Sequence, residues 1–330
     1  MVGEGLVDSF WHSKRVLLTG GNGFLGSYVK ERLIRRGIPE ESLSSPRSSQ
    51  FDLREMSDCR EVASGADLII HLAARVGGIG YNLQAPGSLF YDNAIMGIQM
   101  LEAARLENVP KVVVIGTVCS YPKFTRIPFN EEDLWNGFPE ETNAPYGLAK
   151  KMLLVQSHAY RKQYGMNVIY LIPVNLYGPR DCFDRGRSHV IPALIRKMSE
   201  AKDNGDKTVS VWGSGKASRE FLYADDAAEG IVLAAERYSG PEPVNLGTGT
   251  EVTIERLANM IAKATDFSGE LKWEPSMPDG QPRRRLDTQR AKERFGFEAK
   301  VSLSDGIART VGWYREAHAR GELSFKSPSN

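Results

Sequence analysis

The sequence predicts an α/β protein with a doubly wound parallel sheet, because short apolar runs alternate with segments of helical periodicity. The first unit is an apolar run at residues 15–19, followed by glycines and by apolar residues at helical spacing up to Gly37. Further strands are expected at residues 67–72, 111–116 and 168–174, and helices between them at residues 88–106 and 146–164. Alternation of this kind places helices on both faces of a parallel sheet.

Composition and charge argue against several classes of partner. Lys and Arg number 42 against 41 Asp and Glu, a formal net charge of +1 at pH 7, so no overall field attracts nucleic acid or an anionic membrane. The longest apolar stretches have the length of a strand, far below the ~20 residues that span a bilayer. Residues 1–12 lack the basic start and apolar run of a signal peptide. We therefore expect a cytoplasmic protein with no nucleic-acid or membrane partner.

The cysteines and the acidic pairs do not predict a metal site. Cys59, Cys119 and Cys182 are widely spaced and form no C-x-x-C pattern. Asp225 and Asp226 stand where a helix is expected to begin, so we expect these carboxylates to cap that helix. We expect no metal ion.

Three glycines, Gly20, Gly23 and Gly26, follow the first expected strand and open the first expected helix. In that place the backbone amides and the positive end of the helix can hold a pyrophosphate. A glycine pattern alone also fits an ordinary tight connection between a strand and a helix. Its context favours a dinucleotide site of the Rossmann type, and the G-x-x-G-x-x-G spacing resembles that of short-chain dehydrogenases/reductases.

The loop after the second expected strand bears on the choice of cofactor. An acid there would bind a ribose 2′-hydroxyl, whereas an arginine would pair with a 2′-phosphate. Residues 43–52 contain no acid before Asp52, but they contain Ser44, Ser45, Arg47 and Ser48. We expect NADP(H), with NAD(H) as the alternative. The full set of expected cofactor contacts is Gly20, Gly23, Phe24, Leu25, Gly26, Arg47, Asp52, Leu53, Ala73, Ala74, Tyr146 and Lys150.

Tyr146 and Lys150 are the residues expected to transfer a proton to a carbonyl oxygen. They are four positions apart on an expected helix, so both side chains leave the same face. A nearby ammonium favours the phenolate and should lower the pKa of Tyr146 from its ordinary value near 10. Thr117 follows an expected strand at its carboxyl end, where ligands bind in open α/β sheets. The three residues resemble the catalytic trio of short-chain dehydrogenases/reductases.

Two interleaved domains are expected, because the sequence after Gly178 is richer in Gly, Pro and charge. The Rossmann-type domain that binds the cofactor is expected at residues 13–178 and 219–250. A smaller α/β domain for the substrate is expected at residues 179–218 and 251–330, with helices at residues 190–197, 254–263 and 303–317.

Seven stretches of the chain resemble the GDP-L-fucose synthase family, in order and over nearly the whole length. They are HLAARVGGIGYN (71–82), GTVCSYPK (116–123), TNAPYGLAK (142–150), PVNLYGP (173–179), SHVIPALIRKM (188–198), WGSGKASREFLYADD (212–226) and PDGQPRRRLD (278–287). The resemblance implies conversion of GDP-4-keto-6-deoxy-D-mannose to GDP-L-fucose, by epimerisation at C3 and C5 and then reduction of C4 by NADPH. It also implies the homodimer that is usual in the superfamily, formed by the helices expected at residues 88–106 and 146–164.

The resemblance further assigns Cys119 and His189 as the acid/base pair for epimerisation. Protons on C3 and C5 flank a ketone and can be removed to give an enolate, but inversion needs a base on one face and an acid on the other. Without the resemblance, Cys119 reads as a small core residue and His189 as a helix-end contact. The implied substrate contacts are Asn175, His189, Lys197, Trp212, Arg219 and Arg284.

The chain departs from the family at two places, Thr117-Val118, where Ser-Ser is common, and residues 124–128. Two other functions therefore remain open at this point. One is a nucleotide-sugar epimerase that retains NAD⁺, such as a GDP-mannose 3,5-epimerase or a UDP-hexose 4-epimerase. The other is a non-catalytic protein that senses a dinucleotide.

Overall fold

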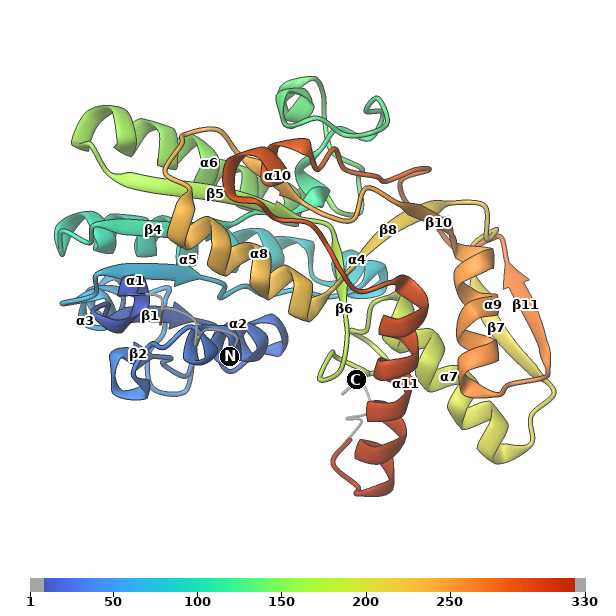
Figure 1. The fold of residues 1–330 in the computed structure, drawn as a ribbon. Helices are drawn as coiled ribbons and strands as arrows, with labels where there is room; N and C mark the ends of the chain where they lie inside the picture. Colours follow the sequence, from blue (N-terminus) through green and yellow to red (C-terminus); the bar gives the residue numbers. More distant parts are fainter. Residues whose placement is uncertain (1–8, 324–330) are drawn as a thin grey trace, which may run out of the picture.

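The core of the molecule is a six-stranded parallel sheet, seen in a computed structural model that describes residues 9–323 (Figure 1). The strand order is β2-β1-β3-β4-β5-β9. The strands are Val16–Thr19 (β1), Leu43–Ser44 (β2), Leu68–His71 (β3), Lys111–Ile115 (β4), Asn167–Pro173 (β5) and Val244–Leu246 (β9). The order reverses direction at β1, which creates a crevice at the carboxyl ends of β1 and β3. The expected α/β class with a doubly wound sheet is confirmed.

Helices cover both faces of this sheet (Figure 1). On one face, α2 packs on α8, and on the other, α5 lies between α3 and α6. Their bounds are Phe24–Arg35 (α2), Met56–Ala63 (α3), Pro86–Leu106 (α5), Ala144–Tyr164 (α6) and Ala224–Arg237 (α8), and the short helices Ser9–His12 (α1) and Gln289–Phe295 (α10) complete this part.

The expected capping role of Asp225 and Asp226 is wrong. The residue that precedes α8 is Tyr223, and it makes no side-chain cap. Asp225 pairs with Arg32 of α2 at 2.5 Å. Asp226 instead accepts hydrogen bonds from the backbone amides of Lys300 and Val301 at 2.9 and 2.8 Å. Both acids therefore link α8 to neighbouring segments of the chain.

A second group of elements lies beside the main sheet and has its own apolar core. It contains a three-stranded sheet of order β10-β8-β6 and a parallel pair, β11-β7. The strands are Asn175–Tyr177 (β6), Thr208–Trp212 (β7), Ser218–Tyr223 (β8), Glu251–Thr253 (β10) and Glu270–Glu274 (β11), and the helices are Val190–Asn204 (α7), Ile254–Thr265 (α9) and Leu303–Ala319 (α11).

Strand β8 lies between the two cores. Leu222 packs into the core of the main sheet, whereas Phe221 and Tyr223 pack into the second core. The alternation follows from the period of two along a strand, which sends neighbouring side chains to opposite faces. The division into domains at residues 178, 219 and 250 stays a prediction.

One helix that the sequence did not predict is Ile79–Gln84 (α4). Together with the 3₁₀ turn Val118–Ser120 (η2), it lies at the crevice where the two groups of elements meet. No helix among residues 9–323 is long and apolar enough to cross a membrane.

Candidate functional site

The three glycines form one tight turn between β1 and α2. Gly20 has φ +70°, and its carbonyl accepts a hydrogen bond from the Gly23 amide at 2.9 Å. A Cβ on Gly26 would lie 2.1 Å from the Gly20 oxygen, and a Cβ on Gly20 would lie 2.9 Å from the Ala73 nitrogen. Gly23 precedes α2 without a side-chain cap, so the first amides of the helix stay available to an anion.

The loop after β2 lies against this turn. The side-chain amide of Asn22 donates to the Ser45 carbonyl at 3.0 Å. A Cβ on Gly21 would lie 2.5 Å from the Ser45 hydroxyl, and that hydroxyl is buried without a hydrogen-bond partner. Arg47 is exposed at the rim of the loop. A buried hydroxyl without a partner beside a cradle of backbone amides fits the phosphates of a dinucleotide.

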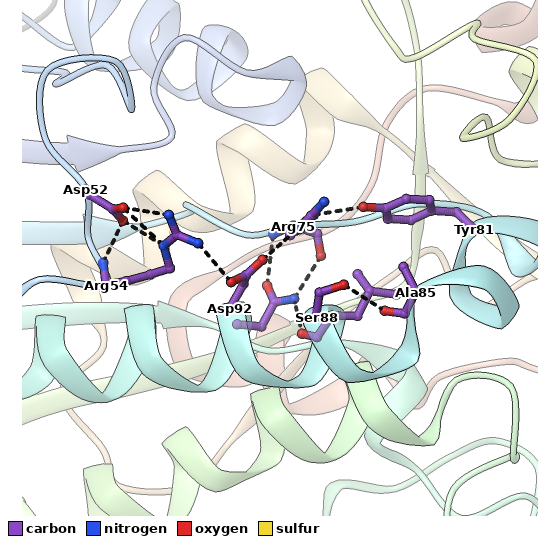
Figure 2. Close-up of polar contacts among 9 residues, drawn as sticks. Asp52, Arg54, Arg75, Tyr81, Ala85, Ser88 and Asp92 are labelled. Atoms are coloured by element: carbon purple, nitrogen blue, oxygen red, sulfur yellow. Dashed lines mark hydrogen bonds and ion pairs between the residues drawn. The ribbon is translucent and has the colours of Figure 1, made fainter. Parts of the chain in front are cut away.

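Asp52 and Leu53 follow this loop. Leu53 is buried, and Asp52 faces Arg54, with 2.7 Å between Oδ2 and Nη2 (Figure 2). Hydrogen bonds from Arg54 lower the pKa of Asp52. The carboxylate therefore stays charged and keeps accepting capacity for a ligand amine.

Thr117 and Tyr146 lie together at the carboxyl end of β4, and Lys150 is buried one turn further along α6. The Thr117 hydroxyl is hydrogen-bonded to the Tyr146 phenol and also accepts the Cys119 amide at 3.2 Å. Helix α6 approaches this turn so closely that a Cβ on Gly147 would lie 2.3 Å from the Cys119 oxygen. A glycine at 147 is therefore needed to bring the phenol and the thiol into one site.

Burial shifts the pKa values of Tyr146 and Lys150 in opposite directions. Desolvation, and then the nearby Cys119, raise the pKa of Tyr146, whereas desolvation lowers the pKa of Lys150 to about 8. The expectation of a lowered tyrosine pKa is wrong, because loss of solvent outweighs the stabilising bond from Thr117. Tyr146 is thus a protonated phenol at neutral pH and can act as an acid. Within residues 9–323, no carboxylate forms an ion pair with the Lys150 ammonium.

Cys119 lies between an amide and a guanidinium. Its sulfur is 3.6 Å from Asn143 Oδ1 and 3.8 Å from Arg284 Nη1. The same Arg284 nitrogen donates to Asn175 Oδ1 at 3.1 Å, and Arg284 Nε donates to Gln281 at 3.1 Å. The structure therefore brings Cys119, Asn175 and Arg284 together, as the sequence implied.

Three polar residues of the site were missed by the sequence reasoning: Asn82, Glu140 and Asn143. All three are buried. Glu140 accepts from Asn143 Nδ2 at 2.5 Å, which turns Asn143 Oδ1 toward Cys119 and toward Asn82 Nδ2 at 3.2 Å. Asn82 and Asn143 lie within the motifs at residues 71–82 and 142–150. Their position in these motifs, beside expected catalytic groups, was the available signal.

His189 is the residue immediately before α7, and its side chain is open to solvent. The dense surroundings, and then the positive charge of Arg284, lower its pKa. The imidazole is therefore neutral near physiological pH and can accept a proton. The preceding segment is held by Gly78, whose amide donates to the Arg187 carbonyl at 3.0 Å.

Two buried guanidiniums, Arg219 and Arg284, lie near each other without an acidic partner. Burial, and then the charge of Arg284, lower the pKa of Arg219 to about 9. Arg219 donates only to the carbonyls of Ser218 and Asp279, at 2.7 and 2.8 Å, and no ion pair to either guanidinium occurs in the described part of the chain. Two buried cations of this kind fit a diphosphate.

The remaining expected substrate contacts lie on α7 and β7. Lys197 Nζ donates to the Ser210 carbonyl at 2.9 Å, and burial lowers its pKa. Trp212 is 47% exposed, and its ring lies close to Gly80 of α4. The indole is therefore free to stack on a ligand, whereas the ammonium already has a backbone partner.

Comparisons with known proteins agree with this geometry. Residues 16–247 match the model of the NAD dependent epimerase/dehydratase family. The chain is 38% identical to probable GDP-L-fucose synthase 1 of Oryza sativa subsp. japonica, over 92% of each chain, and 36% identical to GDP-L-fucose synthase of Escherichia coli strain K12, over 93% and 98%. The structure resembles a GDP-L-fucose synthetase of Naegleria fowleri bound to NADP, with a TM-score of 0.82, 28% identity and coverage of 93% and 95%.

Proposed function

We propose, from the premise that this chain belongs to the NAD dependent epimerase/dehydratase family, that it is a GDP-L-fucose synthase. It converts GDP-4-keto-6-deoxy-D-mannose to GDP-L-fucose, with NADP(H) as the cofactor. The observation that carries this proposal is the convergence of two proton-transfer sets. Tyr146 reaches Thr117 through its phenol, and Cys119 reaches the same threonine through its backbone amide.

In the proposed epimerisation, Cys119 and His189 exchange protons with C3 and C5. One group removes a proton beside the C4 ketone to leave an enolate, and the other returns a proton to the opposite face. Asn143 and Arg284 hold the thiol between them, and the lowered pKa of His189 keeps its imidazole neutral. The same pair serves both carbons in turn.

In the proposed reduction, NADPH supplies a hydride to C4 when it is bound. Tyr146 donates its phenolic proton to the C4 oxygen, since its raised pKa keeps that proton in place at neutral pH. Thr117 orients the phenol, and the Lys150 ammonium supplies positive charge while the phenolate forms.

The remaining residues of the crevice bind the substrate and the cofactor in this proposal. Arg219 and Arg284 bind the diphosphate, Trp212 stacks on the nucleotide, and Asn175 and Lys197 line the sugar side. The cofactor is held by the glycine turn with Phe24 and Leu25, by Arg47 at the 2′-phosphate, by Asp52 and Leu53 at the adenine, and by Ala73 and Ala74 beyond β3. The absence of a side-chain cap at the start of α2 and the unpartnered Ser45 hydroxyl support this placement.

The decisive experiment is incubation of the protein with GDP-4-keto-6-deoxy-D-mannose and NADPH, followed by stereochemical analysis of the sugar. We expect consumption of one NADPH per sugar and inversion at both C3 and C5. Tightly bound NAD⁺ with no net consumption of NADPH would instead identify an NAD⁺-retaining epimerase. A non-catalytic sensor is disfavoured, because Thr117, Cys119 and Tyr146 lie together at one site.

We also propose that the protein is a homodimer, formed through α5 and α6. Both helices carry large exposed apolar side chains, with Tyr91 60% and Val155 53% exposed. Burying them against a second copy removes apolar surface from water. Sedimentation equilibrium tests this assembly: Val155→Glu should yield monomers, and a dimeric variant would exclude this face.

A further inference from the structure

A buried carboxylate joins two arginines that belong to the segments after two different strands of the main sheet, β2 and β3. Asp92 lies on α5 with its side chain 10% exposed. Its Oδ1 is 3.3 Å from Arg54 Nη1, and its Oδ2 is 2.6 Å from Arg75 Nη1 (Figure 2). Arg54 belongs to the loop that follows β2, and Arg75 to the segment that follows β3. Each oxygen of one carboxylate therefore serves a different loop, so neither arginine can shift without affecting the other.

The chain of contacts continues beyond each arginine. On one side, Arg54 holds the carboxylate of Asp52, the residue proposed to contact the adenine, at 2.7 Å. On the other side, Arg75 Nε donates to the Tyr81 hydroxyl at 2.8 Å (Figure 2). The guanidinium of Arg187 lies 5.3 Å from the centre of the Tyr81 ring. The contacts thus run without a gap from the adenine end to the segment before His189.

The backbone of Arg75 is fixed as firmly as its side chain. Asn93 accepts the Arg75 amide and donates to the Arg75 carbonyl, both at 2.9 Å. Three residues later, a Cβ on Gly78 would lie 2.5 Å from the Ser188 oxygen, so the two backbones are in close contact. His189 follows directly. The segment at Arg75 is thus linked through Gly78 to Ser188, the residue before His189.

We propose that Asp92 is a positioning residue that couples occupancy of the adenine end of the cofactor site to the placement of His189. Both oxygens of Asp52 accept hydrogen bonds from the Arg54 guanidinium, Oδ1 from Nε and Oδ2 from Nη2. A ligand amine that binds the Asp52 carboxylate competes with Arg54 for it. Arg54 then interacts more strongly with Asp92, which also pairs with Arg75. This inference rests on the proposed function for its catalytic meaning, but the coupling itself is a property of these side chains.

Hydrogen exchange of the peptide that covers residues 184–190 tests the coupling without catalysis. We expect saturating NADP⁺ to slow exchange there about tenfold in the parent, a typical size for coupling between sites. Asp92→Asn should reduce the effect to less than about twofold, since the amide keeps the shape and loses the charge. Arg54→Gln should do the same, and because its side chain is 46% exposed, this second variant tests the coupling without disturbing a buried position. The matched control is Glu102→Gln, which removes another ion-paired acid from α5 and should leave the tenfold effect intact.

Solvent deuterium entry at C3 and C5 gives the catalytic readout. NADP⁺ should accelerate entry in the parent and in Glu102→Gln, and it should not do so in Asp92→Asn or Arg54→Gln. The proposal would be overturned if both variants kept the NADP⁺ effects seen in the parent. It would also be overturned if NADP⁺ did not protect residues 184–190 in the parent. If the protein does not turn over the 4-keto sugar and yet loses NADP⁺-dependent protection on Asp92→Asn, the coupling stands and the proposed function fails.

Discussion

The guanidinium of Arg284 lies 3.8 Å from the sulfur of Cys119. The same cation contributes to the lowered pKa of His189, after desolvation, and to that of Arg219. One buried charge thus contacts the thiol of the proposed pair and acts through space on its imidazole. Among residues 9–323 no carboxylate pairs with Arg284, so its positive charge remains available to a substrate anion.

Replacing Arg284 with Met should raise the pKa of His189, because a positive neighbour is removed. The imidazole would then be protonated over a wider pH range, and the acidic limb of the pH profile for deuterium entry should move to higher pH. NMR titration of the His189 ring measures the pKa directly. Arg283→Met is the matched control, since Arg283 pairs with Glu251 on the surface. An unchanged pKa in Arg284→Met would refute the electrostatic role.

Cys119→Ser should slow solvent deuterium entry at C3 and C5 by about 10²- to 10⁴-fold, the usual contribution of a positioned acid or base. NADPH binding should be unchanged, because no cofactor contact is proposed for this side chain. Mass spectrometry of the recovered sugar measures the exchange, and fluorescence titration measures cofactor affinity. Cys182→Ser, at an exposed thiol, should behave as the parent. Parental exchange in the Cys119 variant would remove it from the mechanism.

Tyr146→Phe should lower the rate of C4 reduction by about 10²- to 10⁴-fold and leave deuterium exchange nearly intact. The separation follows because Tyr146 is proposed to protonate the C4 oxygen only after the neighbouring carbons have been inverted. NADPH oxidation and exchange should be followed in the same reaction mixture. Tyr164→Phe, on the exposed end of the same helix, serves as the control. Equal reduction rates in the two variants would contradict the assignment.

Arg47→Ala should raise the KM for NADPH about tenfold and leave that for NADH unchanged, because one charge-assisted contact to the 2′-phosphate is lost. Steady-state kinetics with both cofactors measure the ratio. Arg60→Ala removes a surface arginine that pairs with Glu107, and it should preserve the preference. If Arg47→Ala also preserves the preference for NADPH over NADH, other residues bind the 2′-phosphate, and Ser45 is the next one to test.

The sequence predicted β1, β3, β4 and β5 of the main sheet, because each of these strands contains a short apolar run. The elements beside it were predicted less well. Strand β7 pairs with β11, which lies about 60 residues further along the chain, so no local pattern indicates this pairing. Helix α4 was missed because Gly77, Gly78 and Gly80 favour a loop. Gly78 is a glycine for another reason, since its backbone lies in close contact with the Ser188 carbonyl.

The site shows the same limit. Tyr146, Lys150 and Thr117 were found from spacing and position, but Glu140 was not, since its role is to orient the amide of Asn143. The sign of the Tyr146 pKa shift was also wrong. Sequence spacing placed Tyr146 and Lys150 on one face of a helix, whereas the extent of desolvation depends on the packing of α6 against η2.

Lys150→Met should abolish reduction and yet stabilise the fold. In the folded protein, burial lowers the pKa of Lys150 to about 8, from a value near 10.5. Between these two pH values the unfolded chain binds a proton that the folded chain does not, so the parent gains stability as pH rises through that window, and at neutral pH the full cost of burying the charge is present. At about 1.36 kcal/mol for each pKa unit, that cost is roughly 3 kcal/mol. Urea unfolding of parent and variant at neutral pH measures the difference, and repetition above pH 10 should find most of it gone. A variant no more stable than the parent at neutral pH would show that the ammonium is better solvated in the folded state than its burial indicates.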